Sequence, residues 1–245
     1  MARVMDETYA KFRQLDPEKI VETVKALHTR IEERFPGSGL GTVIAELLLV
    51  AQEALERTTW IQRPNLWLRS AAVVLSLGIV ALLVLVLLNI HKFQLDDFTN
   101  SMQGLDASIS SVVFVGAAII FLLSCENRIK RSRSLKAIHE LRALAHIVDM
   151  HQLTKDPESV VRGAVTRQKR PLTATELTRY LDYCSDAMAL ISKIAALYVQ
   201  GFQDPVLLDA VDDVEDLTAG FSRKIWQKIT ILEDLVLDET AAPKL

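Results

Sequence analysis

The sequence predicts an all-α protein in which a two-span transmembrane helical hairpin is joined to a cytoplasmic helical bundle formed by both termini. Three observations support this fold class. Two uncharged apolar runs, Ser70–Ile90 and Ala107–Cys125, approach the roughly 20 residues that cross a bilayer in a helix. Apolar residues elsewhere recur at helical spacing. No segment shows the alternation of polar and apolar residues that is typical of a surface strand.

The two apolar runs divide the chain into three expected parts. Residues 1–64 form an N-terminal cytoplasmic helical hairpin, residues 65–126 the transmembrane hairpin, and residues 127–245 a C-terminal cytoplasmic helical domain. Within the middle part, we expect spans at about 67–90 and 107–125, joined by a short external loop at 91–106. The alternative is a helical pair buried in a large soluble protein. The near absence of polar residues in the first run disfavours it, since a soluble core helix usually has a polar stripe.

The basic residues orient the predicted hairpin. Arg128, Lys130, Arg131 and Arg133 follow the second span, whereas the loop between the spans contains Lys92 as its single Lys or Arg. Because Lys and Arg accumulate on the cytoplasmic side, we expect a multi-pass protein of the bacterial inner membrane with both termini in the cytoplasm. The four residues after the second span are also a candidate lipid-facing cluster, since each such charge adds about 1 kcal/mol of attraction to anionic headgroups.

Two helices are expected before the hairpin. Asp16 is suited to be the N-cap of the first, and Pro17 lies in the first turn, where its missing N–H costs nothing. The run Phe35-Pro36-Gly37-Ser38-Gly39 ends this helix. A second helix is expected from about Gly41 to Thr59, with its apolar residues on one side.

Three helices are expected after the hairpin. The first runs from about Asn127 to His151, and a polar stretch follows it from Thr154 to Pro171. Thr173 and Glu176 match a capping box and predict the start of the next helix. Asp204-Pro205 repeats the Asp-Pro start and predicts the last. Each of these helices has an apolar stripe that needs a partner in water, so we expect one joint bundle with the N-terminal helices, or oligomerisation.

A polar ridge on the helix after the second span carries the strongest candidate chemistry. His139, His146, Asp149 and His151 are candidate ligands for a divalent metal ion, because imidazole and carboxylate groups on adjacent turns can share one. His139 and His146 are two turns apart, so further ligands have to come from another helix. The alternatives are a structural polar seam, in which the histidines donate to carboxylates across a helix interface, and an acid–base role.

Composition narrows the function classes. The net charge of −3 gives no strong attraction to nucleic acid, and two cysteines are too few for a disulfide framework. The uncharged interiors of the predicted spans argue against a charged ion pathway through a single hairpin. A group of acidic residues early in the last helix predicts a solvated face or, alternatively, a cation or docking site: Asp209, Asp212, Asp213, Glu215 and Asp216.

These observations favour a non-enzymatic membrane protein whose helical bundle mediates partner binding, self-assembly or regulation, because no nucleophile with a neighbouring base is visible. The expected partners are membrane lipid and either a second copy of the chain or another protein, with no nucleic acid. The first alternative is a metal-binding or metal-sensing membrane protein that holds a divalent metal ion at His139, His146, Asp149 and His151. The second is a subunit of an oligomeric channel or pore.

Overall fold

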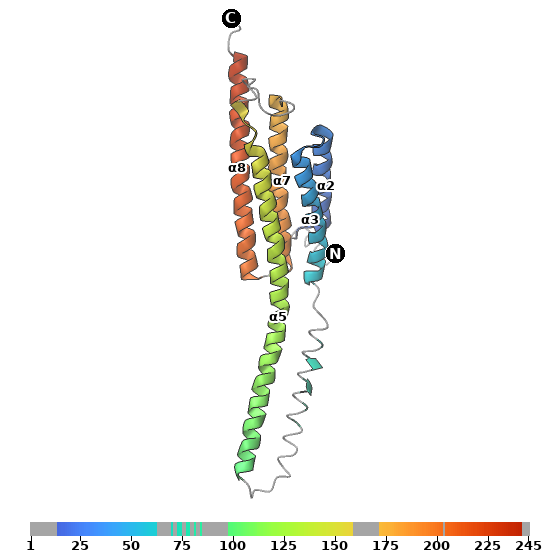
Figure 1. The fold of residues 1–245 in the computed structure, drawn as a ribbon, viewed down its shortest axis with the longest axis vertical. Coiled ribbons are helices and arrows are strands. Elements are labelled where there is room, and N and C mark those ends of the chain that lie inside the picture. Colours follow the sequence, from blue (N-terminus) through green and yellow to red (C-terminus); the bar gives the residue numbers. More distant parts are fainter. Residues whose placement is uncertain are drawn as a thin grey trace, which may run out of the picture. The chain divides into compact units, whose positions relative to one another are not determined.

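The computed structural model describes residues 14–62, 98–158, 172–202 and 204–241, with isolated positions at 70, 73, 74, 77, 78, 81 and 84. Its helices are α2 (Pro17–Arg34), α3 (Gly39–Gln62), α5 (Phe98–Leu153), α7 (Ala174–Gln200) and α8 (Pro205–Ala241) (Figure 1). No strand occurs in these parts of the chain. The predicted all-α class is therefore confirmed.

The predicted transmembrane hairpin is not supported. A span needs about 20 consecutive apolar residues, and no helix within the described residues is both long enough and apolar enough to cross a membrane. The first predicted span, 67–90, falls mostly outside the described residues, whereas the second, 107–125, lies within α5. This finding contradicts the predicted multi-pass localisation in the inner membrane.

The chain divides into two compact units, one made of Met1–Gln62 and Ser134–Leu245 and the other of Arg63–Arg133. The first unit is a helical bundle with α7 at its centre. Helix α7 packs most extensively on α8 and also contacts α2 and α3, which pack on each other. In Figure 1, α7 lies between α8 and the α2–α3 pair. Helix α5 contributes its residues from Ser134 onwards to this unit.

The core of the bundle follows the apolar periodicity of its helices. Spacings of three and four residues separate the buried side chains of α8, as expected for a helix with one buried stripe, and these are Leu207, Val211, Val214, Thr218, Phe221, Ile225, Ile229 and Leu232. Helix α5 buries a similar stripe, which includes Ile138, Leu141, Ala145 and Val148. Most of the stability of amphipathic helices comes from packing of the apolar face, so this shared burial stabilises them.

The helix starts that were predicted from capping residues are confirmed. Thr173 Oγ1 accepts a hydrogen bond from the Glu176 amide at 3.2 Å, and the Glu176 carboxylate accepts one from the Thr173 amide at 2.9 Å. Asp204 Oδ1 accepts from the Val206 and Leu207 amides at 3.1 and 3.3 Å at the start of α8. These bonds satisfy amides that have no partner inside the helix.

Two boundaries differ from the sequence expectation. Helix α5 already begins at Phe98, so residues 98–106 are helical where an external loop was predicted. No proline interrupts 98–106, and nothing else in that stretch forces the helix to end. Helix α3 begins at Gly39 rather than near Gly41, because the turn after α2 is completed by Gly37, whose φ of +65° is a conformation that glycine adopts readily.

Candidate functional site

The structure places the two predicted ligands His139 and His146 on the exposed side of α5. The His146 ring packs edge to face against Phe221 of α8, with ring centroids 5.5 Å apart. Arg142, on the same side of α5, pairs with Asp213 of α8 at 3.6 Å. Along this side of α5, helix α8 therefore supplies the Phe221 ring to His146 and the Asp213 carboxylate to Arg142.

The other two predicted ligands, Asp149 and His151, are half-buried and lie in different surroundings. Asp149 Oδ1 accepts a hydrogen bond from Gln152 Nε2 at 2.7 Å. The His151 ring lies against the start of α3 at Gly39. Burial and the nearby Lys155 lower the pKa of His151. Within the described residues, no group of three or more His, Cys, Asp or Glu side chains could hold a metal ion, so the proposed ligand set is not brought together.

The predicted lipid-facing cluster lies on α5 within the unit Arg63–Arg133. Arg128 and Arg133 are exposed, Arg131 is half-buried and Lys130 is buried. The four side chains thus do not share one exposed face. Whether they contact lipid stays a prediction.

A groove that the sequence did not indicate lies between α2 and α7. It encloses about 560 Å³. Its apolar lining consists of Leu15, Ile20, Ala189 and Leu190, and its polar lining consists of Gln14, Asp16, Lys19, Thr23, Arg30, Asp186 and Lys193. The volume falls within the range of small-molecule sites, which combine apolar walls with a few polar groups.

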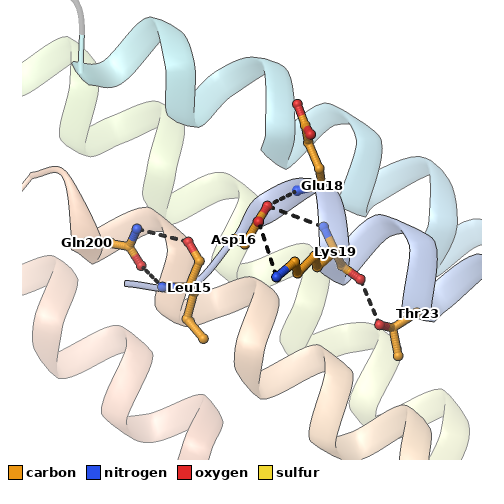
Figure 2. Close-up of polar contacts among 6 residues, drawn as sticks. All are labelled: Leu15, Asp16, Glu18, Lys19, Thr23 and Gln200. Atoms are coloured by element: carbon orange, nitrogen blue, oxygen red, sulfur yellow. Dashed lines mark hydrogen bonds and ion pairs between the residues drawn. The ribbon is translucent and has the colours of Figure 1, made fainter. Parts of the chain in front are cut away.

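The α2 wall of the groove begins at a well-formed helix cap. Asp16 Oδ1 accepts hydrogen bonds from the Glu18 and Lys19 amides at 3.1 and 3.4 Å. Figure 2 shows these bonds together with the contact between the Lys19 ammonium and the other Asp16 oxygen at 3.9 Å. One turn further on, Thr23 Oγ1 donates to the Lys19 carbonyl at 2.7 Å. The first turn of α2 is therefore held in place by its own side chains.

The same wall is tied to the end of α7 by the side-chain amide of Gln200. Its Oε1 accepts from the Leu15 amide at 2.8 Å, and its Nε2 donates to the Leu15 carbonyl at 3.1 Å (Figure 2). One side chain thus satisfies both backbone polar groups of a residue 185 positions away. This two-point clamp joins the segment that leads into α2 to the end of the helix that forms the opposite wall.

Charged side chains also line the groove. Arg30 pairs with Asp186 across the groove at 3.6 Å, with half of each side chain exposed, and its guanidinium stands 5.8 Å from the Tyr183 ring centroid. Lys193 Nζ donates to the Ala189 carbonyl of its own helix at 3.3 Å. Exposed ion pairs contribute little stability, so these groups can exchange their partners for those of a ligand at small cost.

The chemistry of the lining is that of a binding surface. The lining residues include no His, Cys or Ser, and the hydroxyl of Thr23 is engaged by its own helix. Sequence reasoning missed the groove because its two walls are more than 150 residues apart in the chain and carry no motif. Comparisons with protein families, curated proteins and solved structures found no match for this chain.

Proposed function

We propose that this chain is a helical-bundle interaction protein that binds a helical segment of a partner polypeptide in the groove between α2 and α7. The observation that carries the proposal is that the lining combines apolar side chains with three cations and two carboxylates. Amphipathic helices bind in such grooves through apolar anchors, while charges at the border set orientation and partner choice.

The rigidity of the walls supports the proposal. The Asp16 cap and the Gln200 clamp fix the start of α2, and α7 packs on three other helices. A surface that is ordered before binding loses less conformational entropy when the partner arrives.

The test uses a displayed library of amphipathic helical peptides, selected on the full-length protein. Ala189, an exposed residue of α7, lines the groove, whereas Ala143 is an exposed alanine of α5 outside the groove lining. We expect Ala189→Arg to weaken binding of the selected peptides by about tenfold or more, which corresponds to ~1.4 kcal/mol. The matched variant Ala143→Arg should bind them like the wild type.

Two outcomes contradict the proposal. One is a selection that enriches no peptide. The other is a set of enriched peptides whose affinity is the same for Ala189→Arg and for the wild type, since a long cationic side chain in the groove has to displace a ligand seated there.

Self-assembly through α8 is a second candidate function. Trp226 and Leu237 are 59 % and 65 % exposed. Their separation of eleven residues is about three helical turns, so both lie on one face of α8. An exposed tryptophan favours a contact between subunits, because aromatic side chains are enriched in interfaces.

Light scattering on the purified chain tests this second function. If α8 forms the contact, we expect the wild type to have a mass that is a multiple of 27.4 kDa. Trp226→Glu should then have a mass of 27.4 kDa. Leu49→Glu on α3 is the matched control, since Leu49 is 55 % exposed. A monomeric wild type at micromolar concentration excludes self-assembly through α8 and leaves the groove proposal untouched.

A further inference from the structure

The carbonyl groups at the C-terminal end of α5 are bound by a lysine from another helix. Lys228 of α8 donates from its Nζ to the Gln152 carbonyl at 2.8 Å and to the Lys155 carbonyl at 3.3 Å. The last carbonyls of a helix have no partner inside it, and a cation at this end also opposes the helix dipole. Lys228 therefore caps α5 from a distance of more than 70 residues in the chain.

The end of α5 is polar where it enters the bundle. The Gln152 side chain is fully buried, and its Nε2 donates to Asp149 while its Oε1 has no hydrogen-bond partner. Burial lowers the pKa of Lys228, and the carboxylates of Asp149 and Asp156 act in the opposite direction. A buried acceptor without a donor weakens the packing around it.

The last turn of α5 buries little apolar surface, because Val148, the last residue of the buried stripe, lies before it. Met150 and Leu153, which could have packed the last turn of α5 onto its neighbours, are 65 % and 60 % exposed. Segments with few buried apolar contacts open at a lower free energy than the rest of a protein. The two bonds of Lys228, together with the His151 ring lying against Gly39, are therefore contacts that hold this end in place.

Cys184 of α7 lies beneath the end of α5. Its side chain is fully buried, and Lys155, Lys228 and Asp149 are near enough to act on the thiol electrostatically. The Lys155 ammonium also stands 5.1 Å from the ring centroid of Tyr180, one turn before Cys184 on the same helix. The accessibility of the Cys184 thiol therefore reports whether the end of α5 is packed on the bundle.

We propose that Lys228 is a latch that holds the end of α5 on the bundle, and that its release opens this end locally and uncovers Cys184 while the other helices stay folded. The latch is the pair of hydrogen bonds from Lys228 Nζ to the Gln152 and Lys155 carbonyls. Its opening exposes the buried Gln152 amide to water, which supplies the missing donor.

The test measures the rate at which a disulfide reagent labels Cys184 in the native protein, in a Cys125→Ala background with a single thiol. Lys228→Met removes the donors and keeps the length of the side chain. We expect it to increase the labelling rate by about tenfold or more. Lys224→Met is the matched control on the same helix, since the Lys224 ammonium contacts only the Phe221 ring face among the contacts described, and it should change the rate by less than about twofold.

Hydrogen exchange on the same variants shows whether the opening is local. In Lys228→Met, faster exchange confined to residues 149–155 supports the latch. An unchanged labelling rate overturns it, and so does faster exchange spread evenly over α2, α3 and α8, which reports global destabilisation. If Lys228→Met does not fold, Lys228→Gln decides: its shorter, uncharged side chain should still increase the labelling rate by about threefold or more, and an unchanged rate overturns the proposal.

Discussion

The His151 ring occupies the position that a side chain on Gly39 would take at the start of α3. A Cβ on Gly39 would overlap the ring of His151, which reaches this position from the end of α5. The backbone conformation of Gly39 is an ordinary helical one, so conformational freedom does not explain the glycine. Its role here is to let the imidazole ring lie against the backbone.

This contact predicts a non-additive pair of substitutions. Gly39 is the first residue of α3, where helix propensity counts for less than in a helix interior, so the overlap with the His151 ring should dominate and Gly39→Ala should reduce stability by at most about 1 kcal/mol. In a His151→Ala background the same substitution should be neutral or stabilising. Urea unfolding of the four proteins in the cycle measures the coupling. Equal effects of Gly39→Ala in both backgrounds would show that the two residues do not interact.

Cys184 predicts a loss of stability at alkaline pH. Burial raises its pKa from about 9 to about 12, so the unfolded chain releases the thiol proton at a lower pH than the folded protein does. This contribution to stability is fully present below pH 9 and is lost as the pH rises towards 12, on the order of 2 kcal/mol by pH 11. Comparing urea unfolding of wild type and Cys184→Ala between pH 8 and about pH 11 isolates it. If the free energies of unfolding of the two proteins change with pH in parallel, the prediction is wrong.

At the scale of the helix, the sequence was most informative about where elements begin. Asp16, Thr173 and Asp204 were predicted as caps and act as caps, because a cap depends only on residues within one turn. The continuation of α5 through residues 98–106 was missed, since no local signal distinguishes a polar helix from a short loop. The apolar runs themselves were read as membrane spans, which the described helices do not support.

The capping box of α7 gives a prediction at this scale. Thr173→Ala removes the acceptor for the Glu176 amide and should lower the free energy of unfolding by about 1 kcal/mol. Thr175→Ala, two residues further on in an exposed position, is the matched control and should change it by less than about 0.5 kcal/mol. Denaturant titration followed by circular dichroism provides both values. If Thr175→Ala lowers the free energy of unfolding as much as Thr173→Ala does, the capping box makes no specific contribution to stability.

At the scale of the whole molecule, neither the groove nor the latch could be predicted. Both depend on which helices become neighbours, and the residues concerned are scattered through the chain: Leu15 meets Gln200, and Gln152 meets Lys228. Periodicity did identify the exposed side of α5 on which His139 and His146 lie. It could not reveal that the neighbour of His146 is Phe221 rather than a carboxylate.

The central position of α7 predicts that the bundle unfolds as one unit. Ile191 is fully buried on α7, which contacts α2, α3 and α8. Ile191→Ala should cost about 2–5 kcal/mol, because it leaves a cavity, whereas Leu49→Ala at an exposed site should cost less than about 0.5 kcal/mol. Hydrogen exchange of Ile191→Ala should accelerate in α2 and α8 together. Acceleration restricted to one of these helices would show that the bundle is not cooperative.

The clamp between Gln200 and Leu15 has a consequence for the order of events during folding. It closes a loop of 185 residues, and the entropy lost on closing a loop grows with its length. The contacts of α2 with α3 and of α7 with α8 close far shorter loops, so these hairpins should form first and the clamp last. Gln200→Leu should then accelerate unfolding and leave the refolding rate unchanged in stopped-flow measurements. The groove, whose two walls this clamp joins, would then take its final shape only after the hairpins that carry those walls have assembled.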